Sequence, residues 1–244
     1  DYRDQVMRML YTNILTARFT ELSQKPDAPF MYAGPGYGSF IARAVDVYSL
    51  YAGAKENQID KCIEVLITEN EKVRQFGVTA TELEREKKNI ITMYENLAKE
   101  SDKTQSANYA DEFIRNYLEQ ECIPGIEKEF AIVKEFMPGI SLDELNKMGQ
   151  ALTTDENMIV LLTAQEKQGV TVPTEQQVVE IIKYARSKKV EAYVDKVTDV
   201  PLLSEVPVPA SAIKRTQNSD FGYTELVFGN GARIILKPTD FKND

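Results

Sequence analysis

Two groups of residues in this sequence have types and spacings that could bind a ligand or carry out chemistry. The first is a glycine-rich segment, residues 34–38, with the order Gly-Pro-Gly-Tyr-Gly. The second is a set of glutamates at helical spacing: Glu69, Glu71, Glu82, Glu84 and Glu86. Each group suggests a different ligand, a phosphate or extended peptide for the first and a metal ion for the second.

The absence of histidine limits the chemistry more than any motif does. The 244 residues contain no histidine, which excludes Ser-His-Asp and Cys-His catalysis and any metal site that needs an imidazole. The two cysteines, Cys62 and Cys122, lack the spacing of metal ligands. Cys62 falls on the apolar side of a predicted helix, which favours a buried thiol over a disulfide or a nucleophile.

The glycine-rich segment does not have the features of a phosphate-binding loop. It lacks the terminal Gly-Lys-Ser/Thr, and a strand-like run over residues 40–54 follows it where such a loop would begin a helix. We expect an irregular strand at a sheet edge, because glycines weaken a strand and often mark a bulge. Its free backbone groups could pair with an extended peptide. The candidate binding residues are Ala33, Gly34, Gly36, Tyr37 and Gly38. A bulge that only bends the sheet is an equal alternative.

The glutamates are expected on solvated helix faces. A hard cation needs several converging oxygens, and no loop in this sequence supplies them. The carboxylate nearest to an apolar setting is Asp46, between Val45 and Val47, and we expect it to point outward from a half-exposed strand. The sequence therefore predicts neither a metal site nor a pair of catalytic carboxylates.

Composition and charge set further bounds. A chain with 43% hydrophobic residues suits one or two globular domains. The net charge of −9 argues against nucleic acid or an anionic membrane as partner. No apolar run is long enough to predict a membrane span. The sequence begins within a predicted helix and stops just after a predicted strand, so we expect a piece of a larger polypeptide.

Periodicity predicts mostly helices, which we give by residue range: 6–23, 59–76, 80–97, 104–120, 126–136, 141–152 and 174–189. Leu97 and the aromatic residues Tyr109, Phe113 and Tyr117 are expected to face the core. Capping boxes are expected at Thr79 or Thr81, at residues 141–144 and at residues 174–177. A continuous apolar run, residues 158–163, predicts a buried strand. Residues 196–221 predict an extended, proline-rich linker, and residues 224–236 predict a hairpin around Gly-Asn-Gly.

Several motifs, in this order, resemble the pitrilysin/insulinase family of zinc metallopeptidases, and its large bacterial members above all. The motifs lie at residues 18–22 (Arg-Phe-Thr-Glu-Leu), 29–30, 33–38, 76–85, 102–106, 110–113, 123–127 and 226–242. The resemblance implies an α+β fold of two layers, with helices packed on one face of a sheet, like the metallohydrolase domains of that family and of mitochondrial processing peptidase. It also implies that residues 1–195 are the non-catalytic second domain of the N-terminal half. Residues 196–221 would then be the linker between halves, and residues 222–244 the first hairpin of the next domain.

The family's zinc motif, His-x-x-Glu-His, belongs to another domain, and this sequence cannot contain it. The resemblance therefore implies a zinc-dependent parent enzyme whose metal and catalytic residues lie outside these 244 residues. The expected role is part of the wall of a peptide-holding chamber, with strand pairing to peptide as a further expectation. The expected partners are the remaining domains of the same polypeptide and a peptide substrate. The alternative is a structural or regulatory scaffold from an inactive homologue. The compartment stays open, with the bacterial cell envelope or periplasm among the alternatives.

Overall fold

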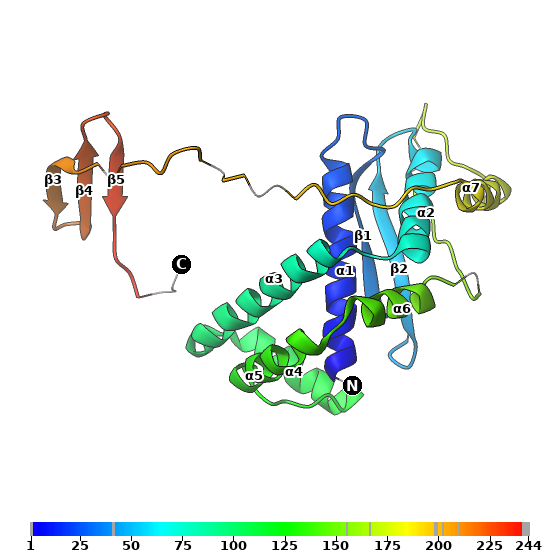
Figure 1. Ribbon diagram of the computed structural model, residues 1–244, viewed down its shortest axis with the longest axis horizontal. Helices are drawn as coiled ribbons and strands as arrows, with labels where there is room; N and C mark the ends of the chain where they lie inside the picture. Colours follow the sequence, from blue (N-terminus) through cyan, green and yellow to red (C-terminus); the bar gives the residue numbers. More distant parts are fainter. Residues whose placement is uncertain are drawn as a thin grey trace.

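A computed structural model describes residues 2–40, 42–154, 156–165, 167–197, 200–201, 203–208 and 210–240. The helices and strands form two separate bodies (Figure 1). The larger body contains α1 (Tyr2–Ser23), β1 (Phe30–Ser39), β2 (Asp46–Ala54), α2 (Ile59–Phe76), α3 (Ala80–Lys99), α4 (Ser106–Glu119), α5 (Ile126–Phe136), α6 (Leu142–Leu152) and α7 (Glu175–Ser187), with 3-10 turns η1 (Ser101–Lys103) and η2 (Met137–Gly139). The smaller body is a sheet of β3 (Ala212–Asn218), β4 (Tyr223–Phe228) and β5 (Arg233–Leu236). This mixed helix and sheet architecture confirms the predicted α+β class.

The long helix α1 organises the larger body. Its apolar residues recur every three or four positions, which places them on one side of the helix. That side is buried in a core shared with α3, α5 and α6: Val6, Met7, Leu10, Tyr11, Ile14, Leu15, Leu83, Ile90, Val133 and Leu145. The helix ends at Ser23, just before Pro26, as predicted.

The glycine-rich segment is itself the strand β1, paired antiparallel with β2. A register shift between Phe30 and Tyr32 gives the strand one irregularity, outside the glycines. The predicted strand start at residue 40 is wrong, because β2 begins only at Asp46. The chain turns there, and the backbone N–H of Val45 donates to the carbonyl of Ala42 at 3.1 Å.

Glycine in β1 leaves room for side chains of β2 that lie across it. A Cβ at Gly36 would lie 2.8 Å from the Ser49 hydroxyl, and one at Gly34 would lie 3.1 Å from the Tyr51 hydroxyl. The hairpin is joined to α1 and α2 by a second core cluster, Phe19, Phe30 and Cys62.

Cys62 is buried and unpaired, as predicted, and burial raises the pKa of its thiol to about 11. A thiol with that pKa is protonated at neutral pH and is a poor nucleophile.

Several residues predicted to face the core are exposed instead. Tyr109, Phe113 and Tyr117 on α4 are 43%, 60% and 80% exposed, and Leu97 on α3 is 48% exposed. Residues 158–163 form no strand and are largely exposed, so the predicted buried strand is wrong. An apolar run becomes a buried strand only when another strand pairs with it, and in the described part of the chain none does.

The capping boxes are confirmed at three helix starts. Thr79, Ser141 and Thr174 each accept a hydrogen bond from the backbone N–H three residues later. The alternative box that begins at Thr81 is not formed, because α3 starts at Ala80 and the Thr81 hydroxyl donates to Asp195 instead.

The hairpin of β4 and β5 around Gly229-Asn230-Gly231 is also confirmed. Gly231 has φ +84, a conformation that favours glycine, and its N–H donates to the carbonyl of Phe228 at 2.9 Å. The sheet has a third strand, β3, which lies within the segment predicted as linker. The strand-forming part of the chain therefore starts at Ala212, well before residue 222.

Candidate functional site

The predicted binding residues lie on β1, whose backbone groups divide between two directions. In an antiparallel pair, alternate residues direct both N–H and C=O toward the partner strand. Pro35 lies opposite Leu50 and has no N–H to donate. It therefore suits a strand position whose backbone groups point away from β2. Alternation then turns Ala33 and Tyr37 outward. It turns the backbone groups of Gly34, Gly36 and Gly38 toward β2, so the sequence-predicted residues separate into edge-facing and ladder-forming sets.

Helix α1 packs along β1 and limits access to this edge (Figure 1). Gly34 and Pro35 are buried, while Gly36, Tyr37 and Gly38 are half-buried and Ser39 is exposed. The guanidinium of Arg8 on α1 lies 4.4 Å from the centre of the Tyr37 ring, a cation–π contact that holds this end of the strand. The accessible part of the edge is therefore its end from Gly36 to Ser39.

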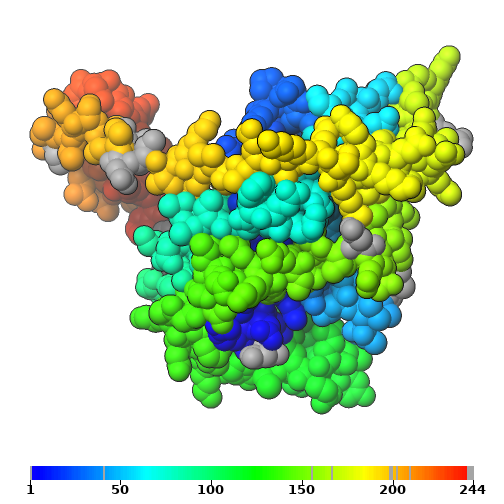
Figure 2. All heavy atoms as spheres, turned by 45° about the vertical axis from the view of Figure 1, so that its right-hand side comes forward, coloured from blue at the N-terminus to red at the C-terminus, as the bar shows by residue number. Residues whose placement is uncertain are grey.

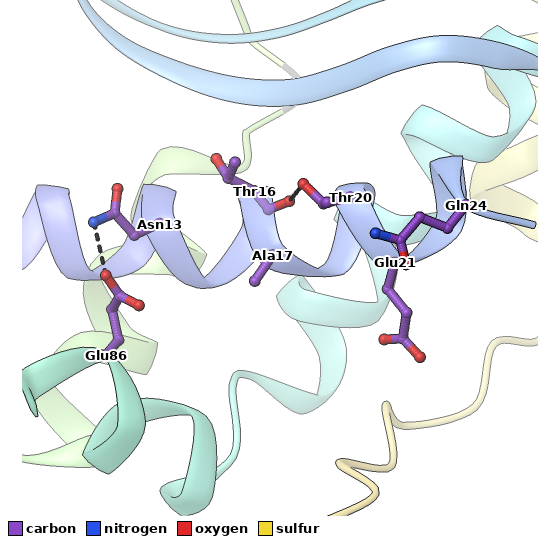
Figure 3. Close-up of a pocket in the computed structure, with 7 residues that line it drawn as sticks. All are labelled: Asn13, Thr16, Ala17, Thr20, Glu21, Gln24 and Glu86. Carbon is purple, nitrogen blue, oxygen red and sulfur yellow. Dashed lines mark hydrogen bonds between the residues drawn. The ribbon is translucent and has the colours of Figure 1, made fainter. Parts of the chain in front are cut away.

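A shallow groove runs along the outer side of α1, as Figure 3 shows. It encloses about 470 Å³ and is lined by α1 residues three or four positions apart together with one residue of α3: Asn13, Thr16, Ala17, Thr20, Glu21, Gln24 and Glu86. No sequence motif marks this groove. The only signal for it was the polar stripe opposite the apolar side of α1.

Most hydroxyl and amide groups of the groove already donate hydrogen bonds within the chain. The hydroxyl of Thr16 donates to the carbonyl of Thr12, and that of Thr20 to the carbonyl of Thr16, both at 2.8 Å. The amide of Asn13 donates to a Glu86 oxygen at 2.7 Å (Figure 3). The groups that the groove presents to solvent are chiefly hydrogen-bond acceptors, and the carboxylates of Glu21 and Glu86 give it negative charge. Such a surface suits backbone N–H groups or cations and carries no nucleophile with an adjacent base.

An ion pair with almost no exposure lies next to the groove. Arg18 on α1 is 4% exposed and Glu82 on α3 is 2% exposed. The Nε of Arg18 donates to Glu82 Oε1 at 2.6 Å and its Nη2 donates to Oε2 at 2.7 Å. Glu82 was predicted on a solvated face, and that prediction is wrong. The signal that could have found the pair is Arg18 itself, a charged residue at a core position of the α1 pattern.

The segment that follows α7 is fastened over this ion pair. The Tyr193 ring lies 4.2 Å from the guanidinium carbon of Arg18, and its hydroxyl donates to Glu21 at 2.9 Å. Burial, followed by the nearby Glu21, raises the pKa of Tyr193 to about 12. Figure 2 shows this segment, in yellow, lying across the surface of the larger body.

Asp195 fastens the same segment to the start of α3. It accepts from the Thr81 hydroxyl at 2.7 Å and from Arg85 at 2.9 Å. Burial raises the pKa of Asp195, but these two hydrogen bonds outweigh burial and the net shift is downward.

The remaining candidate glutamates are paired with cations and do not converge. Glu69 accepts from Lys72 and Glu71 from Arg74, both at 2.6 Å, and both glutamates are buried, against expectation. Burying a carboxylate is costly, and the paired cation three residues later offsets that cost for each glutamate. Glu84 pairs with Lys87 and is exposed, as predicted.

These residues do not fit a zinc ion. The sequence has no histidine, and within the described ranges no three Cys, Asp or Glu side chains are grouped to hold a metal. Asp46 is exposed, as predicted. No helix in the described part of the chain is long and apolar enough to cross a membrane.

Comparison with known proteins gives this geometry a context. No family model matches the chain. A protein of Arabidopsis thaliana described as "Zinc protease PQQL-like" is 24% identical over 246 residues, which is all of this chain and 22% of that protein. The crystal structure of the periplasmic protease PqqL from Escherichia coli superposes with a TM-score of 0.66 at 18% identity, over 98% of this chain and 27% of that one.

Two further structures agree. The first half of PqqL superposes with a TM-score of 0.61 at 15% identity, over 80% of this chain and 42% of that one. An insulinase family protease from Yersinia pestis superposes with a TM-score of 0.63 at 12% identity, over 76% of this chain and 39% of that one.

The chain has the fold of a segment of insulinase-family proteases. The resemblance predicted from the sequence is thereby confirmed. The chain spans only about a fifth of the curated relative that it matches. That relative is a plant protein and the solved structures are bacterial, so the comparisons do not single out a bacterial source.

Proposed function

We propose that this chain is the non-catalytic part of a zinc-dependent peptidase, forming part of the wall of its peptide-holding chamber. One observation carries the proposal: the whole chain is similar to part of a zinc protease-like protein, yet it contains no histidine. A zinc site of the insulinase type needs imidazole ligands. The metal and the catalytic residues would therefore be supplied by other domains of the same polypeptide.

The domain division is part of this proposal. Residues 1–195 would be the second domain of the N-terminal half, residues 196–221 the segment between halves, and residues 222–244 the start of the next domain. The similarity to the first half of PqqL covers 80% of the chain, the share that 195 of 244 residues represent. Similarity to whole PqqL covers 98%. This difference supports a boundary near residue 195.

The proposed contact with substrate is strand pairing along β1. Tyr37, at the accessible end, would supply the outward N–H donor and carbonyl acceptor to an extended peptide, while Ala33 faces outward at the end that α1 covers. Gly36 and Gly38 would allow close approach of the peptide backbone at the accessible end. Because backbone groups supply the hydrogen bonds, pairing would show little preference for sequence.

The catalytic part of the proposal is tested with the purified 244-residue chain. We expect no cleavage of fluorogenic peptides at any zinc concentration, because the chain has no histidine to form the family's catalytic zinc site. Cleavage that survives re-purification and is altered by substitutions in this chain would overturn the proposal.

The strand-pairing part is tested by amide hydrogen exchange with an extended Thr-Val peptide. We expect the amide of Tyr37 to exchange at least tenfold more slowly in the presence of the peptide, while Gly36, already paired with β2, is unchanged. Tyr37→Pro removes the donor and should abolish the protection, whereas Tyr37→Phe keeps the backbone N–H and should retain it. Equal protection by a peptide whose alternate residues are proline would contradict strand pairing.

The second candidate function is a structural or regulatory scaffold from an inactive homologue. The lack of histidine, and of a metal-holding group of side chains among the described residues, is equally consistent with that role. The parent protein distinguishes the two: a His-x-x-Glu-His motif elsewhere in the polypeptide supports the peptidase, and its absence supports the scaffold.

A further inference from the structure

Helix α4 differs from an ordinary surface helix because neither its apolar side nor its charged side is buried. Such a helix normally buries its apolar side and turns its charged side to water. None of the residues of α4 is buried. Its large apolar side chains are 43–80% exposed, and we call this set the α4 apolar face: Tyr109, Phe113, Ile114, Tyr117 and Leu118.

The described charged residues of α4 make two exposed ion pairs. Glu119 pairs with Arg43 in the turn between β1 and β2 at 3.8 Å. Arg115 pairs with Glu121, just beyond the helix, at 2.8 Å. Both pairs are exposed and contribute little to stability, so the apolar face is exposed because no described element packs against it.

The charge around this face is strongly negative. Residues 106–129 contain six carboxylates and two cations, a net charge of −4. Three of these carboxylates act on one another: Glu129 on α5 has its pKa raised, first by burial and then by repulsion from Glu112 and Glu121. Mutual repulsion among these groups would be relieved by a cation placed between them.

Charge decides what could cover the α4 apolar face. A second copy of this chain would bring another −4 against the first, and an anionic membrane would also be repelled. A cationic partner would be attracted in two ways. Its Lys and Arg side chains are attracted to the carboxylates, and they also stack on the faces of tyrosine and phenylalanine. Tyr109, Phe113 and Tyr117 are four residues apart and form a row about 12 Å long. That length matches about two turns of a partner helix.

We propose that the α4 apolar face is the docking site of a cationic amphipathic helix. The partner's apolar side chains would pack between the aromatic row and the pair Ile114 and Leu118, in the helix-in-groove manner. Its basic side chains would lie over Asp111 and Glu112 at the rim. This inference rests on α4 alone and does not require the protease parentage.

The test uses the 244-residue chain and labelled 18-residue peptides, with affinity followed by fluorescence anisotropy. The probe is an amphipathic Leu/Lys helix, and the controls are a Leu/Lys peptide of the same composition in scrambled order and a Leu/Glu helix of the same pattern. We expect the amphipathic Leu/Lys helix to bind at least tenfold more tightly than either control. Scrambled order that binds equally well would overturn the proposal by showing simple charge attraction.

Matched variants locate the site. The double variant Phe113→Ser, Tyr117→Ser should weaken binding at least tenfold. Phe221→Ser removes an aromatic residue that is 68% exposed in the turn between β3 and β4, and should leave binding unchanged. Asp111→Asn with Glu112→Gln should weaken binding several-fold and reduce its dependence on salt. All the substituted side chains on α4 lie outside the core, and circular dichroism verifies that the fold is retained.

Two outcomes would assign the face to another occupant and overturn the proposal. One is a dimer in sedimentation velocity that Phe113→Ser dissociates, which would indicate a second copy. The other is binding to zwitterionic lipid vesicles that the double variant abolishes, which would indicate a membrane surface.

Discussion

Arg18 and Glu82 show how much depends on single residues in this protein. Both lie in the interior, where removing a charge from water is costly unless a partner with good geometry compensates. Here the pairing is bidentate, and Glu82 also accepts from the backbone N–H of Thr79 at 2.7 Å. One carboxylate thus holds α1, caps α3 and supports the segment that carries Tyr193.

Replacing Glu82 should therefore destabilise the fold severely. We expect Glu82→Gln to lower the free energy of unfolding by about 3–5 kcal/mol, because it leaves the buried charge of Arg18 uncompensated. Urea unfolding measures the change. The control Glu84→Gln removes an exposed partner of Lys87 and should change the free energy by about 0.5 kcal/mol or less. If both variants behave alike, the pair contributes nothing specific. Arg18→Met with Glu82→Leu should recover much of the loss.

Gly149 on α6 is a second residue with a sharp expected outcome. A Cβ there would lie 2.4 Å from the ring of Tyr11, whose side chain is fully buried and has no room to move. Overpacking costs about 1–3 kcal/mol, while alanine gains about 1 kcal/mol in a helix. We expect Gly149→Ala to lower thermal stability despite its better helix propensity. Gly139→Ala, where no atom lies within 4 Å, is the matched control and should have little effect.

Among the elements, α6 has the capping box with the clearest electrostatic consequence. Glu144 accepts hydrogen bonds from the backbone N–H and the hydroxyl of Ser141, and from Arg3. These contacts, the backbone hydrogen bond first, lower the pKa of Glu144 to about 2.

The variant Ser141→Ala should raise the pKa of Glu144, though not to its ordinary value, because the backbone N–H and Arg3 remain. NMR titration of the Glu144 side chain measures the shift. A lowered folded-state pKa stabilises the fold above the ordinary carboxyl pKa, and this contribution is lost as pH falls toward 2. Part of the difference in free energy of unfolding between wild type and variant comes from Glu144. That part should be present at pH 7 and should vanish near pH 2. A pKa of Glu144 that does not change would contradict the capping role.

At the scale of the whole molecule, the connection between the two bodies is the weak point. Val206 and Val208 are both 89% exposed, and the described residues around them belong to no helix or strand. The larger body, by contrast, is held by the core around α1 and by the fastening of Tyr193 and Asp195.

Limited proteolysis should first cut between residues 200 and 211. Elastase, which cleaves after small aliphatic residues, should release a fragment of about the first 200 residues before it cuts elsewhere, because exposed extended backbone fits a protease and packed helices do not. Mass spectrometry of the earliest products identifies the cut. Earlier cleavage within residues 59–100 would contradict the proposed domain boundary.

Local features of this fold could be predicted from the sequence because they depend on near neighbours in the chain. The bounds of α2, the capping boxes at Thr79, Ser141 and Thr174, and the turn at Gly231 were all predicted in advance. Each depends on interactions over three to seven residues. The lack of histidine likewise determined, without any structure, that this segment holds no zinc site of the insulinase type.

The tertiary structure decided which side chains are buried and what each faces. Glu82 and Glu84 are two residues apart on one helix, yet one lies in the interior and the other in solvent, because only Glu82 faces Arg18 of α1. The aromatic row of α4 has the spacing of a core-facing helix but lies exposed, because no described element of the chain packs against it. The glycine-rich segment forms a strand because β2 pairs with it along its length, and Ser49 and Tyr51 of β2 lie where side chains at Gly36 and Gly34 would extend. Burial depends on the element that lies opposite, and that element is set by contacts distant in sequence.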